Sequence, residues 1–138
     1  MNLEAGLFSV LKSASAVAAL VSNPTSPTTY RIFPGRIPQG ETRPSIRYDR
    51  ISTVRPQGLD GPSAFLTSRF QIDVWGETEA AARALGDAVV AAIDGNRGSF
   101  GPATIQHGYV EDVGALPEFD PDERDYRITM DYVIVASD

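Results

Sequence analysis

The sequence has no cysteine and, among its 138 residues, only one histidine, His107, and one lysine, Lys12. Without cysteine the chain cannot form a disulfide framework, a thiolate metal site or a cysteine nucleophile. His107 has no second histidine or cysteine with which to complete a catalytic pair or a zinc site, so an ordinary strand histidine is the better interpretation. We therefore expect no enzymatic activity, no catalytic residue and no cofactor.

An acidic segment resembles a calcium loop only superficially. Asp120 and Asp122 are spaced as the first two ligands would be, but Asp125 is one position beyond the third. A calcium loop also needs glycine at its sixth position and a bidentate glutamate at its twelfth, where this chain has Asp125 and Asp131. We expect a solvated or interface loop here rather than a metal site.

Glycines and serines also fail to form a known catalytic or phosphate-binding motif. Gly95, Gly98 and Gly101 follow an expected helix rather than open one, and no Lys-Ser or Lys-Thr pair follows to hold phosphate and magnesium, so they are typical of turns. Ser63 and Ser99 lie near glycines but lack the Gly-x-Ser-x-Gly elbow of hydrolases. The missing catalytic groups favour an assembly role.

Basic residues are few and almost all are arginine. The formal net charge is −6, and eighteen acidic residues face twelve basic ones, so a general nucleic-acid-binding surface is not expected. Arginine makes forked contacts with carboxylates, and its dominance is compatible with charge-paired assembly. The N-terminal residues lack a basic leader and a cleavage signal, and Lys12 interrupts their apolar pattern. We expect a soluble chain with no membrane partner.

The length fits one compact domain covering residues 1–138. Apolar residues at helical spacing predict one N-terminal amphipathic helix, or two broken near Ser13 to Ser15, with a face formed by Leu3, Leu7, Val10, Leu11, Ala14, Val17, Ala18 and Val21. Prolines then end the helix, and Tyr30 to Phe33 form a short expected strand.

A strand followed directly by a helix is the clearest pattern in the chain. Phe70, Ile72 and Val74 alternate with Arg69, Gln71 and Asp73, which predicts a half-buried strand with one polar face. Gly76 ends this strand. Glu77 and Glu79 suit the first turn of a helix, whose apolar stripe comprises Ala81, Leu85, Ala88, Val89, Ala92 and Ile93. Gly95 suits the left-handed position beyond the helix end.

Three further strands are expected. Ser45 to Val54 forms one, with a bulge near Asp49 or Arg50 because Ile51 breaks the alternation. Residues 104–113 and 126–135 form the others, and the segments near 34–44, 55–64 and 114–125 form projecting loops. The order predicts an α+β fold in which helices cover one face of a mainly antiparallel sheet of about four to five strands.

The polar faces of two expected strands form the candidate interface. These side chains would be either a solvated face of a monomer or an intersubunit surface, and they are Arg69, Gln71 and Asp73 beside Arg127, Thr129 and Asp131. The loops at 34–44 and 56–62 are candidates for partner recognition, since loops often carry it.

Several phrases occur in one order along nearly the whole chain. They are Leu7-Phe8-Ser9-Val10-Leu11, Arg31-Ile32-Phe33-Pro34-Gly35, Pro38-Gln39, Arg43-Pro44-Ser45-Ile46-Arg47-Tyr48, Leu59-Asp60-Gly61-Pro62-Ser63, Phe70-Gln71-Ile72-Asp73-Val74-Trp75, the 79–95 helix and Arg124-Asp125-Tyr126-Arg127-Ile128. In this order they resemble the tail completion, or tail terminator, proteins of long-tailed phages and gene transfer agents. The proline-rich residues 23–29 look like a modest insertion.

The resemblance implies a non-enzymatic structural protein of a virion or phage-like particle, located at the head–tail junction. It implies a homo-oligomeric ring, usually a hexamer, at the head-proximal end of the tail tube. Such a ring stops tail polymerisation and joins the tail to the head connector or stopper protein, while DNA passes through the lumen without specific binding. Because walls that repel phosphate ease this passage, we expect an acidic or neutral lumen.

Two alternatives remain at this point. Another head–tail connector component or a minor tail protein of similar size would share these features but contact different partners. A small monomeric ligand-binding domain or a cryptic enzyme would need a pocket with convergent polar groups.

Overall fold

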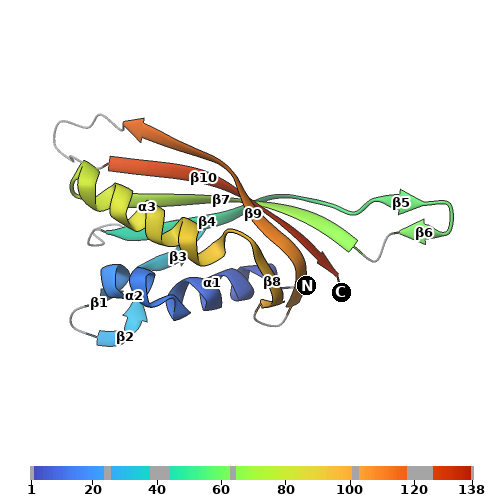
Figure 1. Cartoon of the computed structure of the whole chain (residues 1–138), viewed down its shortest axis with the longest axis horizontal. Helices are drawn as coiled ribbons and strands as arrows, with labels where there is room; N and C mark the ends of the chain where they lie inside the picture. Colours follow the sequence, from blue (N-terminus) through green and yellow to red (C-terminus); the bar gives the residue numbers. More distant parts are fainter. Residues whose placement is uncertain are drawn as a thin grey trace.

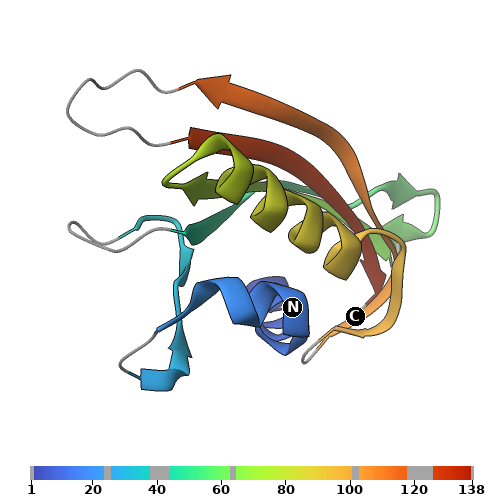
Figure 2. The same cartoon turned by 60° about the vertical axis from the view of Figure 1, so that its left-hand side comes forward.

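The computed structural model describes residues 2–23, 26–37, 44–62, 65–100, 103–117 and 126–137. Three helices lie on one side of a curled six-stranded sheet, which confirms the predicted α+β class (Figures 1 and 2). The helices are α1 (Leu3–Ser13), α2 (Ser15–Val21) and α3 (Glu79–Ile93). The strands are β1 (Ser22–Asn23), β2 (Ser26–Tyr30), β3 (Ile32–Pro34), β4 (Ser45–Val54), β5 (Gln57–Gly58), β6 (Gly61–Pro62), β7 (Phe65–Gly76), β8 (Asn96–Phe100), β9 (Ala103–Pro117) and β10 (Tyr126–Ser137).

The main sheet has the strand order β3-β4-β7-β10-β9-β8. Its neighbours are antiparallel except for β3 and β4, which are parallel, so the prediction of a mainly antiparallel sheet is confirmed. β1 with β2 and β5 with β6 form two small separate hairpins. β5 and β6 extend away from the body at one end of the molecule (Figure 1).

The N-terminal helical pattern is broken as predicted. Ala14 has extended backbone angles, φ −73° and ψ 115°, between α1 and α2. Asn2 caps α1 by accepting a hydrogen bond from the Ala5 amide at 3.0 Å. Leu3, Leu7 and Leu11 are fully buried on the face that the periodicity predicts.

The central strands have the predicted pattern. Phe70, Ile72 and Val74 are fully buried beneath the helices. The pairing of β4 with β7 shifts register between Arg50 and Ser52, which places the predicted bulge at Ile51.

α3 has Glu79 in its first turn as predicted, whereas Glu77, also expected there, lies just before the helix. The Thr78 side chain caps it by accepting a hydrogen bond from the Ala81 amide at 3.0 Å, and Gly95 follows its end with φ +77°. Gly76 lies where β7 turns into α3, and a Cβ there would be 2.6 Å from the Ala82 amide nitrogen. Only glycine permits this close approach of strand and helix.

The sheet contains more strands than expected. β8 was not predicted, because its sequence, Asn-Arg-Gly-Ser-Phe, is polar and includes Gly98 at φ +87°, which is typical of a turn. It nevertheless pairs with β9 across a register shift. β9 and β10 also extend beyond the predicted 104–113 and 126–135, and Tyr30 lies in β2 rather than in one strand with Ile32.

The expected loops lie partly outside the described residues. The 55–64 segment forms the predicted projecting hairpin, of which residues 63 and 64 lie outside the described part. Residues 38–43 and 118–125, which include the acidic aspartates and most of two expected loops, also lie outside it, as do residues 24–25 of the apparent insertion. Residues 114–117, expected in a loop, extend β9.

Arg31 anchors the N-terminal half to the sheet. Its guanidinium is buried and donates hydrogen bonds to the backbone oxygens of Pro44 at 2.7 Å and of Ser22 and Leu20 at 3.0 Å each. Leu20 lies in the last turn of α2, where the exposed carbonyls and the helix dipole favour a cation. One side chain therefore joins α2, the β1 segment and the start of β4.

Among the described residues, no single helix has the length and apolar composition needed to cross a membrane. α1 and α2 reach that length and composition only as a pair, across an 87° bend.

Candidate assembly interface

The outer face of the sheet, away from the helices, brings the predicted interface residues together. In the β7–β10 register, Asp73 lies opposite Thr129, Gln71 opposite Asp131, and Trp75 opposite Arg127. Arg69 lies opposite Val133 on the same face. The strand alternation read from the sequence therefore placed all of these side chains on one surface, which we call the outer polar face.

Asp73 is the buried centre of this face. Although it belongs to the polar side of β7, its side chain is completely buried. The Gln71 amide donates to its two carboxylate oxygens at 3.3 and 3.2 Å, and the Arg47 guanidinium forms an ion pair with it, Nε to Oδ2, at 3.3 Å. These contacts satisfy the carboxylate within the subunit, since a buried charge without partners would be costly.

Arg69 forms the centre of a second, more exposed cluster. Its Nη1 contacts the Glu111 carboxylate of β9 and lies 3.4 Å from Oδ2 of Asp131 on β10. The hydrogen bond that Arg69 donates to Glu111 is the main reason that the pKa of Arg69 is raised, and the charge of Asp131 adds to it. One guanidinium between two carboxylates thus links β7, β9 and β10 at the surface. Because these ion pairs are exposed to solvent, their contribution to stability is small.

Arg127 lies over the ring of Trp75, with its guanidinium carbon 5.6 Å from the ring centroid. Trp75 is almost fully covered. A guanidinium at this distance from an indole makes a cation–π contact. The indole lies on the outer polar face, where the Arg127 side chain shields it.

Sequence reasoning missed two charged members of this face. Arg47 could have been found from the sequence. Strand alternation in β4 puts it on the polar side with Asp49, and antiparallel pairing of β4 with β7 brings it opposite Asp73. Glu111 could not, because it lies at a register shift in β9, where it falls between Val110 and Asp112 in the pairing with β10.

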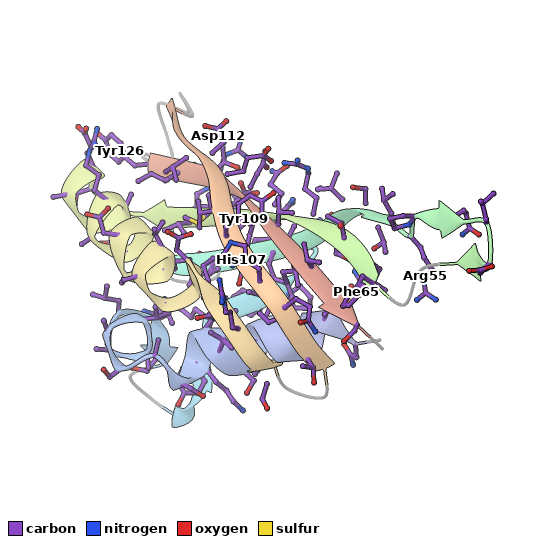
Figure 3. All side chains as sticks on the ribbon, turned by 45° about the vertical axis from the view of Figure 1, so that its right-hand side comes forward. Arg55, Phe65, His107, Tyr109, Asp112 and Tyr126 are labelled. Carbon is purple, nitrogen blue, oxygen red and sulfur yellow. The ribbon has the colours of Figure 1, made fainter. Side chains whose placement is uncertain are left out.

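His107 and Tyr109 lie on β9, on the same side of the sheet as the outer polar face (Figure 3). Their rings stack with centroids 5.3 Å apart and planes inclined by 25°. No group of three or more histidine, cysteine, aspartate or glutamate side chains that could hold a metal ion occurs in the part of the chain that the structure describes. His107 thus lies in a strand, where the sequence placed it, with its ring stacked on that of Tyr109.

The projecting hairpin is the second candidate surface. The β5–β6 turn exposes Leu59 completely, and the adjoining ends of β4 and β7 expose Val54 and Phe65. Figure 3 shows Arg55 and Phe65 at this end of the molecule, far from Asp112 and Tyr126. Exposed apolar side chains gathered on a protruding element are typical of an interaction surface.

The third surface is a groove at the end of the molecule away from the projecting hairpin. It has a volume of about 490 Å³ and lies between α3 and the ends of β9 and β10. Arg83, Gly86, Asp87, Val90, Ala91, Val113 and Ile128 line it. Its lining is mainly apolar, with one cation and one anion on the α3 side.

Comparison with known protein families gives one match over almost the whole chain. The family model described as "Tail completion protein gp17" matches residues 5–137. No curated protein sequence matches the chain.

Comparison with solved structures shows the same fold in a virus-like particle. A chain of the virion of a native gene transfer agent particle superposes with a TM-score of 0.75 and 16% identity, covering 99% of this chain and 94% of that one. Two structures from Akkermansia muciniphila, one of a protein without its transmembrane region, have TM-scores of 0.32 and 0.33 and identities of 12% and 10%. They cover 65% and 67% of this chain and 44% and 42% of theirs, and such low scores carry no argument.

Proposed function

The chain belongs to the tail completion protein gp17 family, and from this premise we propose that it forms a closed ring at the head-proximal end of the tail tube. Family membership makes it a structural protein of the phage tail. The finer role is our proposal: the ring, a hexamer, terminates tail polymerisation and joins the tail to the head connector. The family match over residues 5–137 is the observation that carries it.

The surfaces of the subunit support a ring. A closed head-to-tail ring needs two different complementary surfaces on each subunit. The outer polar face, the apolar hairpin and the groove supply distinct surfaces on different parts of the chain. We treat residues 1–138 as one domain, because α1, α2, α3 and the central strands share one buried cluster.

We further propose that the protein is not an enzyme. It binds partners and holds them in position, and those partners are other copies of itself, the tail tube protein and the head connector or stopper. A second candidate, another head–tail connector component or minor tail protein, would use the same exposed surfaces but contact only some of these partners.

Negative-stain electron microscopy of the purified protein, alone and mixed with tail tubes of the same particle, tests this role. We expect rings, or tubes capped at one uniform end. Mass photometry of the ring should give six subunits. Protein that stays monomeric and leaves both tube ends bare would contradict the terminator role, and binding to the connector alone would favour the second candidate.

The proposed use of the outer polar face as an intersubunit surface needs its own test. Arg69→Gln keeps a polar side chain but removes the charge between Glu111 and Asp131. If these groups contact a neighbouring subunit, ring formation should weaken about tenfold, because charged contacts that are desolvated in an interface contribute more than exposed ones. Arg97→Gln, on the exposed part of β8, is the matched control.

Unchanged assembly of Arg69→Gln would assign the outer polar face to solvent. Asp73 is unsuitable for this purpose, since it is buried within one subunit and its substitution would disturb the fold itself. Gln71, Arg127 and Asp131 remain proposed interface residues on the same basis as Arg69.

A further inference from the structure

The hairpin tip exposes a leucine for which the subunit provides no cover. Leu59 is fully exposed at the two-residue turn between β5 and β6, where Gly58 pairs with Gly61. Val54 and Phe65, 59% and 48% exposed, lie at the ends of β4 and β7 where the hairpin leaves the sheet. Exposed apolar side chains clustered on one protruding element indicate a contact with another molecule.

The groove offers an apolar site of a size suited to such a tip. Val113 on its β9 side is 52% exposed, and Val90, Ala91 and Ile128 complete the apolar lining. Pockets of roughly 300–1,000 Å³ bury most of the surface of a drug-sized ligand, which is larger than one leucine side chain. The groove volume of about 490 Å³ is within this range.

The charges of the two surfaces are compatible. The hairpin from residue 55 to residue 62 carries one cation, Arg55, and one anion, Asp60. The groove also carries one cation, Arg83, and one anion, Asp87. Arg83 is ion-paired with Glu79 of the same helix at 2.9 Å. Neither surface therefore has a net charge that would oppose burial of the apolar side chains.

The hairpin cannot reach the groove of its own subunit. β4 and β7 stay paired as far as Val54 and Thr67, which holds the hairpin straight out from the sheet. Figure 3 shows Arg55 and Phe65 at one end, and Asp112, next to the groove residue Val113, near the other. Two complementary surfaces at opposite ends of one chain favour contact between successive copies.

We propose that the β5–β6 hairpin of one copy docks in the α3–β9 groove of the next, with Leu59 inserted between Val90 and Val113. The partner is a second copy of this chain. The inference deepens the proposed ring and rests on it, because it assigns the two complementary surfaces that a head-to-tail ring requires.

Site-directed cross-linking tests this contact cleanly, because the natural sequence contains no cysteine. The variant Leu59→Cys with Ala91→Cys places one thiol at the hairpin tip and one in the exposed wall of the groove. The control pair is Leu59→Cys with Lys12→Cys, which moves the second thiol to an exposed position on α1. Both proteins, alone and on tail tubes of the same particle, are treated with a short bis-maleimide.

A ladder of covalent oligomers from the 59/91 pair but not from the 59/12 pair is the expected result. Equal ladders from both pairs would overturn the inference, because they would reflect random collision. Rings in electron micrographs without a 59/91 ladder would overturn the inference and leave the ring intact. Absence of self-association, with and without tubes, would overturn both the inference and the ring.

Single substitutions provide an independent measurement. Leu59→Ser should raise the protein concentration needed for half-maximal assembly about tenfold, as expected for loss of a central apolar anchor. Leu20→Ser, at another exposed leucine on α2, is the matched control and should leave assembly unchanged. Both side chains are exposed, so both variants should keep the thermal transition of the parent, and an unchanged Leu59→Ser assembly would overturn the inference.

Discussion

Among single residues, Arg31 does the most to connect segments that are distant in the sequence. Its guanidinium serves three backbone oxygens, those of Leu20, Ser22 and Pro44, in a buried position. A charged donor gains more from such bonds than a neutral one, so three of them from one buried side chain stabilise the joining of these segments.

Replacing Arg31 with methionine should therefore lower the free energy of unfolding by about 3 kcal/mol, since it removes three hydrogen bonds donated by a charged, buried side chain. Urea denaturation followed by circular dichroism measures the change. Arg36→Met, at an exposed arginine of the same segment, should change stability by less than about 0.5 kcal/mol. Equal effects of the two substitutions would show that the three hydrogen bonds of Arg31 do not stabilise the fold.

Tyr132 makes stability depend on alkaline pH. Its fully buried hydroxyl donates to the Ile93 carbonyl oxygen at 2.9 Å, and burial, with the nearby charge of Asp94, raises its pKa well above the ordinary value of 10.0. Above about pH 10 the unfolded chain loses this proton while the native chain keeps it, so stability falls as pH rises.

Tyr132→Phe should cost about 1 kcal/mol at neutral pH through the lost hydrogen bond, and it should flatten the decline in stability above about pH 10. Denaturant titrations at several pH values from about 7 to about 11 measure both effects, because this range includes the ordinary tyrosine pKa. Tyr126→Phe, at a 41% exposed tyrosine, should reproduce the parent curve. A Tyr132→Phe curve as steep as that of the parent would assign the alkaline sensitivity to other groups.

For whole elements, the junction of β7 with α3 sets how closely the helix lies on the sheet. A Cβ at Gly76 would be 2.6 Å from the amide nitrogen and 2.9 Å from the Cα of Ala82, and both are backbone atoms that cannot rotate away. The helix would have to move as a unit, together with the core side chains Leu85 and Val89 that it buries.

Gly76→Ala should therefore lower the free energy of unfolding by about 3 kcal/mol, the cost of overpacking at a rigid contact. Thermal unfolding measures it. Gly114→Ala is a matched control in β9, because nothing lies within 4 Å of its Cβ position. A Gly76→Ala protein as stable as Gly114→Ala would mean that the strand and helix separate at little cost.

Across the whole molecule, the excess of acidic over basic residues bears on how DNA would pass a ring of these subunits. Each chain carries a formal net charge of −6, and the arginines of the outer polar face that contact carboxylates, Arg47 and Arg69, are paired within the subunit. Paired arginines have little capacity left for phosphate, and DNA affinity depends on unpaired, clustered basic side chains.

Fluorescence anisotropy with labelled double-stranded DNA should therefore give a dissociation constant weaker than about 10⁻⁴ M at physiological salt. A basic DNA-binding protein in the same buffer is the positive control. Micromolar binding that weakens steeply with added salt would contradict the acidic or neutral lumen that we propose.

Most of the elements could be predicted from the sequence because they follow local patterns. Alternation at Phe70 and Ile72 placed β7, the helical spacing of Leu3 and Leu7 placed α1, and Gly95 marked the end of α3. β8 could not be predicted, since its polar residues pair only because β9 lies beside them. Glu111 was missed for a similar reason, because a register shift in β9 hides its place from simple alternation.

The sequence alone determined the periodicities, the turns and the shared face of Arg69, Gln71 and Asp73 on one strand, because each depends on neighbours within a few residues along the chain. Only the tertiary structure decided that Asp73 is buried, that Arg31 serves three distant carbonyls, and that the hairpin and groove lie at opposite ends. Those outcomes depend on strand register and helix packing, which bring together residues far apart in sequence and therefore leave no local pattern.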